Sequence, residues 1–545
     1  MSVKEFNIEL KSDSKFANRK DLLLAFASGL MLGLAFPPLP FYPLLFVAFI
    51  PLFKVLERRN SLAEINRITY FSMFIYNIIT LYWVGSWQPD TDSFLMVAGV
   101  ALLFFNPIVF LIPTTIYYWT YKKFGRKIGL YLFPLFWVTA EFLYGISDFR
   151  FPWVTLGHSL SYFNSFIQIA DIIGSFGLGI LVIYINIFFF ITYKNFIELR
   201  NHFIPLFLGV GLIALALIYG GIKINTLPRA NSKLKIGVVQ PNLNPWKKWE
   251  AGNLDQQLDL YLELSIKEVK NGAELIVWPE TALPVYLLAG GYERIVEDIH
   301  KFCDTNNVYL LTGMPHANFY FDSTEAPREA KKTNSGTYYT SYNSIVLFQP
   351  GNREIPKYGK IKLVPFGEKV PLVEHIPFLG DIIKWNVGIS SWNEGKEQKV
   401  FEVKQDNKSF NVAGVVCIES IYPRFINGFV DNGAELLIVV TNDSWYGDSS
   451  GPYQHKEMSV LRAIETRRSV VRSANGGISC VIDKLGNTKI STEMYTRTSF
   501  TFDVEINNEK TIYSSTAYVL PLLSLLVSIF VMFAFTFDKI KKKKK

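Results

Sequence analysis

The first 225 residues consist of long apolar runs broken by short polar loops. A helix needs about 20 mainly apolar residues to cross ~30 Å of hydrocarbon. Suitable runs lie near residues 21–37, 42–56, 68–86, 94–120, 128–145, 166–193 and 203–222. The first two are short and flank the turn Pro37–Pro40, so a single re-entrant hairpin is an alternative to two spans. The pattern predicts an N-terminal membrane domain, residues 1–225, with about seven spans.

Residues 226–512 have a different pattern, with more charge and with periods of 2 and 3.6 in place of unbroken apolar runs. This segment of roughly 280 residues can form its own core. Strands and helices alternate along it, which favours an α/β sandwich or layered sheet. The predicted strands are Lys233–Gln240, Ala273–Val277, Val308–Thr312, Asn343–Phe348, Asn411–Val416 and Glu435–Val440, and the predicted helices are Leu254–Lys270, Tyr292–Thr305 and Met458–Ser473.

A last apolar run, Ala517–Phe537, lies in residues 513–545 and is followed by the basic tail Lys539–Lys545. It is long enough to span a membrane, which brings the predicted total to eight. The composition agrees with this: 50% of the residues are hydrophobic and 19% charged, and the mean hydropathy is +0.20. Such a chain is too apolar for an ordinary soluble protein, so most of the additional apolar residues must contact lipid.

The net charge of +8 raises the possibility of a nucleic-acid partner. However, the basic residues lie mostly in short loops between apolar runs, and the sequence has no helix-turn-helix or C-x-x-C signature, which excludes this class. Lysine and arginine in short loops mark the cytoplasmic side. They precede the first run and alternate from loop to loop, whereas the opposite loops carry only Arg150. Both termini are therefore predicted to be cytoplasmic and the large domain to lie outside.

Three polar residues follow or precede predicted strands in the large domain: Glu280 after AELIVWP, Lys360 before IKLVPFGE, and Cys417 after NVAGVV. Strand ends are where α/β proteins place their chemistry. A thiol can act as a nucleophile, a buried carboxylate as its base, and a lysine can stabilise an oxyanion. Together the three residue types form a complete set for acyl transfer. Cys303 and Cys480 are expected to be structural, and three cysteines leave at least one free thiol.

Four segments of this domain resemble the signature blocks of the nitrilase superfamily: Trp278–Glu280, Lys360–Glu368, Cys417–Glu419 and Thr441–Gly447. With the predicted spans around them, nearly the whole chain resembles the apolipoprotein N-acyltransferase family, and Phe151–Ser159 is similar to that family's outer-loop motif. The resemblance implies a multi-spanning helical bundle with a nitrilase-like αββα sandwich, in the bacterial inner membrane and with a periplasmic catalytic domain.

The resemblance also implies an activity. A phospholipid would donate an acyl chain to Cys417 as a thioester, and the α-amine of a diacylglyceryl apolipoprotein would accept it, without cofactor or metal. Glu280 would be the base and Lys360 the oxyanion stabiliser. Glu368, Glu419 and Trp249 match further functional positions. Ile418 stands where the family usually has tyrosine, and its backbone N–H is still able to complete an oxyanion hole.

Other interpretations stay open from the residues alone. A membrane-tethered amidohydrolase would use the same three residues with water as acceptor, and a transporter or receptor would have a non-catalytic outer domain. The apolar loops Ala282–Ala289 and Ile376–Trp385 are either lids for acyl chains or packed segments. His455 lacks an evident Ser or Asp partner, which favours a structural role. No histidine pair has metal-ligand spacing.

Overall fold

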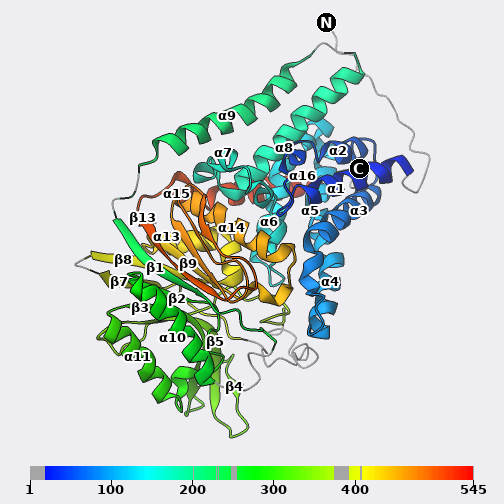
Figure 1. Ribbon diagram of the computed structural model, residues 1–545. Coiled ribbons are helices and arrows are strands. Elements are labelled where there is room, and N and C mark those ends of the chain that lie inside the picture. Colours follow the sequence, from blue (N-terminus) through cyan, green and yellow to red (C-terminus); the bar gives the residue numbers. More distant parts are fainter. Residues whose placement is uncertain are drawn as a thin grey trace.

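The computed structural model describes residues 19–199, 202–228, 230, 232–246, 254–372, 392–405 and 408–543, and shows a helical bundle beside an α/β sandwich (Figure 1). The helices of the bundle are α1 (Arg19–Leu34), α2 (Ile50–Leu56), α3 (Leu62–Leu81), α4 (Ser93–Val109), α5 (Leu111–Phe124), α6 (Arg126–Ile146), α7 (Asn164–Ile167), α8 (Ala170–Ile197), α9 (Ile204–Thr226) and the C-terminal α16 (Val519–Lys543). Short 3₁₀ turns at Tyr42–Phe46, Tyr82–Gly85, Pro152–Val154 and Leu156–Leu160 connect them.

Six helices in the described part of the chain are long and apolar enough to cross a membrane, two fewer than the eight predicted spans. These helices are Leu62–Gly85, Ser93–Phe124, Arg126–Ile146, Ala170–Ile197, Ile204–Thr226 and Val519–Lys541. The difference comes from the first two apolar runs. The α1 helix has 16 residues and rises only about 24 Å, and the second run forms only a short helix after the proline-rich turn.

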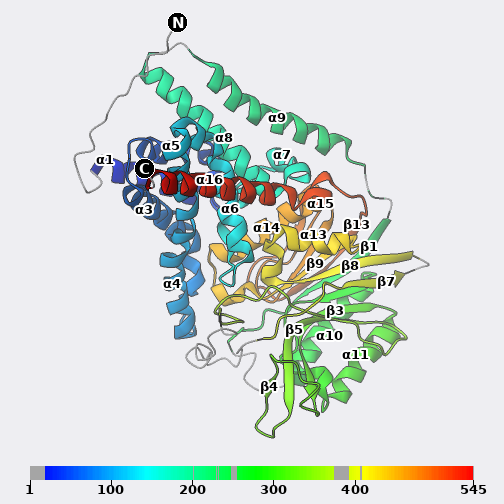
Figure 2. The same cartoon turned by 180° about the vertical axis from the view of Figure 1, so that it is seen from behind.

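The span formed by α4 and α5 is unusually long, with 32 residues from Ser93 to Phe124. It bends at Phe110, where α4 ends shortly after its internal Pro107. A helix of this length rises about 48 Å, well beyond the ~30 Å of a hydrocarbon core. The Ser93 end of α4 therefore reaches past the rest of the bundle toward the sandwich (Figures 1 and 2).

Two mixed sheets form the centre of the large domain. The first has the strand order β13-β1-β2-β3-β5-β4, with β6 beside β5, and the second has the order β12-β11-β10-β9-β8-β7. The strands are β1 (Ser232–Gln240), β2 (Leu275–Trp278), β3 (Tyr309–Tyr320), β4 (Lys331–Lys332), β5 (Tyr338–Phe348), β6 (Lys357–Gly359), β7 (Val400–Gln405), β8 (Lys408–Val416), β9 (Leu436–Thr441), β10 (Ser469–Ala474), β11 (Cys480–Ile482), β12 (Thr488–Ser491) and β13 (Thr498–Ile506).

Helices cover both outer faces of these sheets, so the sandwich has the predicted αββα layers (Figures 1 and 2). The helices α10 (Leu254–Lys270) and α11 (Glu293–Asn306) lie on the first sheet. The helices α13 (Pro423–Asp431) and α14 (Ser450–Thr466) lie on the second, between it and the bundle. Residues 469–473 were predicted as helix but belong to the central strand β10, because pairing with β9 and β11 decides their conformation.

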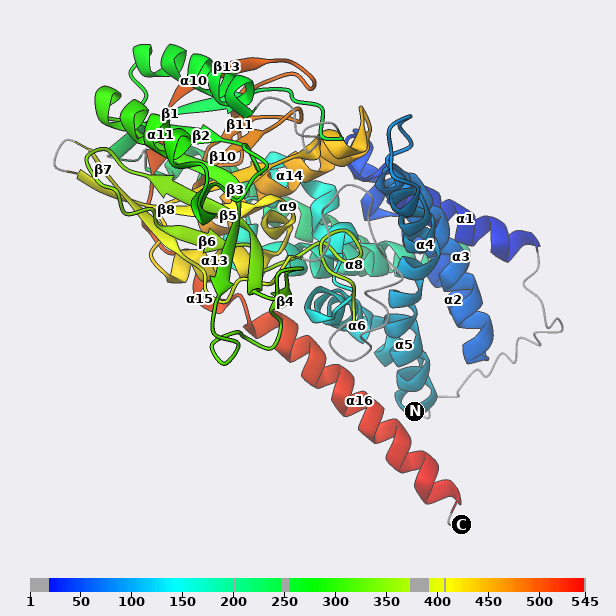
Figure 3. The same ribbon diagram turned by 90° about the horizontal axis from the view of Figure 1, so that it is seen from below.

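Polar contacts fix the sandwich against the bundle. Arg467 forms a buried ion pair with Asp171 of α8, 2.7 Å between Nη2 and Oδ2. Gln454 of α14 accepts hydrogen bonds from the indole N–H groups of Trp83 and Trp153. A short helix α15 (Ile512–Thr516) then leads into α16, which runs away from the sandwich along the bundle side (Figure 3). The large domain therefore packs directly against the bundle through buried polar contacts.

Candidate active site

The three residues expected to carry the chemistry line one pocket of about 170 Å³. Glu280 follows β2, Lys360 follows β6, and Cys417 begins a short 3₁₀ turn directly after β8. Their strands belong to both sheets, so the pocket lies where the ends of the two sheets meet. The structure thus brings together side chains that are 137 positions apart in the sequence, from Glu280 to Cys417.

Cys417 occupies a sharp turn of the backbone with a φ of +50°. This left-handed conformation costs a non-glycine residue about 1 kcal/mol or more, and such strain clusters at functional sites. The turn points the side chain of Cys417 into the pocket, whereas the next side chain, Ile418, is buried in the core and does not line the pocket. Any contribution of Ile418 to the chemistry is therefore limited to its backbone.

Lys360 is almost fully buried and is surrounded by negative charge. Its Nζ lies 2.8 Å from Oε2 of Glu368 and 3.6 Å from Oε1 of Glu280. Asn343 on β5 connects the two carboxylates, donating from Nδ2 to Glu280 at 2.7 Å and to Glu368 at 3.1 Å. Burial alone would lower the pKa of Lys360, but Glu368 and Glu280 outweigh it and raise that pKa. The lysine is therefore a permanent cation in the pocket.

Burial affects the protonation of both Glu280 and Cys417. Burial raises the pKa of Glu280 above the usual value for glutamate, although the charge of Lys360 acts in the opposite direction. Burial and the charge of Glu280 likewise raise the pKa of the Cys417 thiol, against the effect of Lys360. The resting thiol is thus protonated. A nucleophile in this state needs a neighbouring base, which is the arrangement expected for Glu280.

Glu419 has a different environment from the other acidic residues of the site. It is fully buried, and its carboxylate accepts four hydrogen bonds, from Tyr358 Oη at 2.7 Å and from the backbone N–H groups of Ile361, Lys362 and Val416 at 2.7, 3.1 and 2.9 Å. It does not line the pocket. Glu419 therefore joins the segment after Lys360 to the turn at Cys417, and holds both in place.

A Glu419→Gln substitution is expected to destabilise the fold, because an amide N–H₂ group would face N–H donors where a carboxylate oxygen now accepts. Loss of such charge-assisted hydrogen bonds costs about 2 kcal/mol, equivalent to a melting temperature roughly 4–8 °C lower. Glu402→Gln, at an exposed position on β7, is the matched control for thermal melting in detergent. Equal melting temperatures of the two variants would contradict this role.

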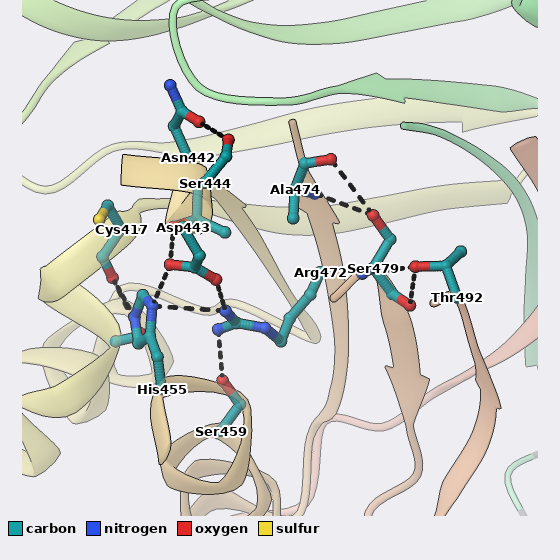
Figure 4. Close-up of polar contacts among 12 residues, drawn as sticks. Cys417, Asn442, Asp443, Ser444, His455, Ser459, Arg472, Ala474, Ser479 and Thr492 are labelled. Atoms are coloured by element: carbon teal, nitrogen blue, oxygen red, sulfur yellow. Dashed lines mark hydrogen bonds and ion pairs between the residues drawn. The ribbon is translucent and has the colours of Figure 1, made fainter. Parts of the chain in front are cut away.

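A buried network lies behind the turn at Cys417 (Figure 4). His455 Nδ1 lies 2.8 Å from Oδ1 of Asp443, whose Oδ2 accepts from Arg472 at 3.0 Å. His455 Nε2 contacts Ser420 Oγ at 2.9 Å and the Cys417 carbonyl oxygen at 3.1 Å. The sulfur of Cys417 points away from the imidazole (Figure 4). His455 therefore holds the backbone of the turn and is not placed to take the thiol proton.

Asp443 and His455, with Cys417, offer atoms of metal-ligand type within 4.8 Å of one another. The imidazole and the carboxylate, however, bind each other, and Arg472 places a positive charge beside them. This arrangement fits a positioning role. Sequence reasoning missed the partner Asp443, although it lies in the Thr441–Gly447 segment directly after β9.

The remaining residues and loops that were expected at the site do not line the pocket or lie outside the described residues. Trp249 and the loop Ile376–Trp385 lie outside the described residues. In the loop Ala282–Ala289, the side chains of Ala282, Leu283 and Leu287 are buried in a core beneath the first sheet, so this loop is packed and is not an open lid. Asn343 was missed as a site residue, because a strand asparagine has no distinguishing sequence pattern.

One side of the pocket is apolar and comes from the membrane bundle. Leu95, Ala98, Leu102 and Phe105 of α4 line it, with Phe149 and Phe151 from the loop after α6. The same helix exposes large apolar side chains on its other faces, including Val97 at 66% and Phe104 at 54%. The polar centre is therefore adjacent to an apolar surface that is continuous with a membrane-spanning helix.

Comparison with known proteins assigns both parts of the chain. Residues 28–188 match the apolipoprotein N-acyltransferase N-terminal domain, and residues 235–508 match the carbon-nitrogen hydrolase family. An apolipoprotein N-acyltransferase of Chlorobaculum tepidum is 30% identical over 92% of this chain and 94% of its own length. That of Geobacter metallireducens is 29% identical over 91% of each, and that of Rickettsia typhi 30% over 86% and 88%.

Solved structures of nitrilase-superfamily proteins match about half of the chain. An amidase from Nesterenkonia sp. is 15% identical, covers 52% of this chain and 94% of its own, and has a TM-score of 0.36. Saccharomyces cerevisiae Nit3 is 16% identical, covers 53% and 95%, and also has a TM-score of 0.36. The assignment of this chain to a family therefore rests on the sequence matches and not on these structures.

The match over residues 235–508 identifies the sandwich as a carbon-nitrogen hydrolase domain, attached to a multi-spanning membrane bundle. Because relatives of about 30% identity match nearly the whole chain, the protein belongs to the apolipoprotein N-acyltransferase family. It is therefore a multi-pass membrane N-acyltransferase of the nitrilase superfamily.

Proposed function

We propose that this protein transfers an acyl chain from a membrane phospholipid to the α-amine of the N-terminal diacylglyceryl-cysteine of apolipoproteins. The transfer proceeds in two steps through a thioester at Cys417, with Glu280 as base and Lys360 as oxyanion stabiliser. The shared pocket of these three residues, with an apolar side formed by the membrane helix α4, is the observation that supports it most strongly.

In the first step, Glu280 accepts the thiol proton and the Cys417 sulfur attacks the ester carbonyl of the phospholipid. The Lys360 ammonium stabilises the negative oxygen of the tetrahedral intermediate. When the C–O bond breaks, Glu280 returns the proton to the leaving oxygen, and a lysophospholipid departs. Since the thiol is protonated at rest, base and nucleophile must act together, which their common pocket allows.

In the second step, the α-amine of the lipoprotein attacks the thioester carbonyl. Glu280 takes a proton from the amine, Lys360 again stabilises the oxyanion, and the C–S bond breaks to give an amide and the free thiol. Glu368 supports both steps indirectly. Its carboxylate fixes the Lys360 ammonium at 2.8 Å and shares the Asn343 amide with Glu280.

The apolar lining favours this transfer over hydrolysis of a soluble amide. A small polar amide would gain nothing from contact with the apolar side chains of Leu95, Leu102 and Phe105, which lie on a membrane-spanning helix. An acyl chain, by contrast, gains about 0.8 kcal/mol for each buried CH₂ group. Closing the pocket with lipid also keeps water from the thioester.

We infer that the protein lies in the bacterial inner membrane, with residues 226–512 as a periplasmic catalytic domain and with residues 1–225 and 513–545 as membrane segments. Both termini are then cytoplasmic. An even number of spans supports this arrangement, since five long apolar helices precede the sandwich and one follows it. Basic residues in alternate loops support the same orientation.

The test uses purified protein with a phospholipid that carries an isotope label in its acyl chains, together with a diacylated lipopeptide that has a free N-terminal amine. We expect the label in an amide on the lipopeptide and an equal amount of lysophospholipid. Label recovered only as free fatty acid would support the amidohydrolase alternative and contradict the proposed acceptor.

The rate of acylation is expected to depend on pH through Glu280. The base must be ionised to accept the thiol proton, and burial raises its pKa. As the pH falls, the rate should therefore decline at a higher pH than the titration of an ordinary glutamate, while Lys360 stays charged. The measurement is the initial rate of acyl-enzyme formation between pH 4 and 9. A rate that is constant down to the usual glutamate pKa of about 4.3 would contradict this role.

A further inference from the structure

A second cleft, of about 210 Å³, lies between the bundle and the sandwich. Glu141, Phe142 and Ile146 of α6 line one side, Lys362 and Arg424 of the catalytic domain line the other, and Tyr518 closes the end next to α16. The catalytic pocket is on the opposite side of the loop that follows α6, because Phe149 and Phe151 line that pocket and Pro152 lines this cleft. The cleft is thus separate from the reacting groups.

Two cations in this cleft lack a carboxylate partner among the described residues. Arg424 stacks on the ring of Tyr518, with its guanidinium carbon 3.5 Å from the ring centroid, and its buried Nε has no hydrogen-bond partner. Lys362 Nζ lies over the rings of Tyr422 and Phe425, 5.9 and 5.7 Å from their centroids. Burial, with the positive charges of Arg150 and Arg424, lowers the pKa of Lys362.

The acids near Lys362 are already engaged elsewhere. Glu394 pairs with Arg150 and with Lys369, and Glu419 accepts its four hydrogen bonds within the protein. Two partly buried cations in one cleft repel each other and lose hydration. An anion between them would remove both costs, and guanidinium is well suited to bind a phosphate.

Glu141 places a buried carboxyl group in the cleft. It is only 4% exposed, and its Oε1 accepts hydrogen bonds from Trp137 Nε1 at 2.9 Å and Leu156 N at 2.7 Å. Its Oε2 is buried and has no partner. A buried carboxylate oxygen without a partner is costly inside a membrane protein and marks a site that a ligand can complete.

The cleft opens at the level where spanning helices meet the catalytic domain. Tyr518 directly precedes α16, and Ile146 is the last residue of α6. Beside the cleft, α16 exposes Val519, Leu522, Leu523 and Leu526, each by 44–63%. An aromatic side chain at a helix end, above an apolar face, is typical of the membrane interface. Lipid tails can lie on α16 while the head group enters the cleft.

We propose that this cleft binds the head group of a phospholipid that is not consumed, with its phosphate between Arg424 and Lys362 and its ammonium group at Glu141 Oε2. The ligand class is an amine-bearing phospholipid such as phosphatidylethanolamine. Such a lipid would fix the catalytic domain on the membrane surface, since Arg424 and Lys362 belong to the sandwich and Glu141 and Tyr518 to the spanning segments.

Native mass spectrometry of the full chain tests the proposal by counting retained lipids. All variants carry Cys417→Ser, so that no lipid is consumed, and are exposed to vesicles of equal parts phosphatidylethanolamine and phosphatidylglycerol. We expect Lys362→Gln with Arg424→Gln to lose one retained lipid, with at least a fivefold fall in the most highly lipidated species. The matched control Lys510→Gln, an exposed lysine of the same domain, should retain it.

Two further variants keep the result interpretable if the double variant fails to fold. Arg424→Lys preserves the cation and should retain the lipid. Glu141→Gln preserves the shape and should shift the retained lipid from phosphatidylethanolamine toward phosphatidylglycerol by at least threefold. Equal lipid retention by the double variant and Lys510→Gln, or an unchanged lipid preference in Glu141→Gln, would overturn the proposal.

Discussion

Replacing Cys417 with serine is expected to reduce acyl transfer to the lipopeptide by at least about a thousandfold. The site holds even the thiol in its protonated form, since burial and the charge of Glu280 raise its pKa. A serine hydroxyl is far less acidic than a thiol and would rarely ionise in the same pocket. The measurement is the initial rate of lipopeptide N-acylation per mole of folded protein.

Cys303→Ala is the control for this variant. Cys303 is also a free, buried cysteine, but it lies on α11 and away from the pocket. Its loss should leave the rate within about threefold of the native rate, apart from a modest cost in stability of roughly 1 kcal/mol. Comparable rates in Cys417→Ser and the native protein would show that the transfer does not need the Cys417 thiol, and would contradict its role as the nucleophile.

Replacing Glu280 with glutamine is expected to lower the rate of acyl-enzyme formation by about 10³-fold, within the range for loss of a general base. The amide preserves the shape but has no proton-accepting carboxylate. The remaining activity should rise steadily with pH, because only spontaneous ionisation of Cys417 then produces the thiolate. A native pH profile would have a plateau instead.

The control for Glu280→Gln is Glu297→Gln, a change of the same kind at an exposed position on α11. It should leave both the rate and the pH profile unaltered. If Glu280→Gln kept more than a tenth of the native rate with the native pH profile, another group would have to accept the thiol proton.

Local patterns in the sequence predicted most of the catalytic domain. The helix Leu254–Lys270 was predicted to its last residue. Glu280 and Cys417 were singled out because each follows a buried strand, and Lys360 because of its spacing to Pro365–Glu368. Helices, buried strands and catalytic motifs can be recognised from periodicity and short patterns that extend over only a few residues. All of the strand Ser469–Ala474 except its last residue was predicted as helix, because its conformation depends on two partner strands elsewhere in the chain.

The first two predicted spans differ from the helices of the structure for a related reason. Apolar composition made residues 21–37 and 42–56 look like spans, but composition does not fix where a helix ends. The structure ends α1 at Leu34, and the second run becomes a 3₁₀ turn followed by the short helix α2. Buried contacts with neighbouring helices, and not lipid alone, account for much of this apolar surface.

The network behind Cys417 shows what sequence reasoning misses. His455 was expected to lack an acidic partner, yet Asp443 binds it at 2.8 Å and Arg472 completes the group. The three residues come from the turn after β9, from α14 and from β10. Only the packing of the second sheet against α14 brings them together, so no spacing in the sequence indicates their contact.

Intact-protein mass spectrometry after mixing the purified protein with phospholipid tests the central claim most directly. The native protein should gain the mass of one acyl chain, Cys417→Ser should gain none, and adding the diacylated lipopeptide should remove that mass while the lipopeptide gains it as an amide. Failure to form an adduct on the native protein under conditions where the lipopeptide becomes acylated would contradict a thioester intermediate.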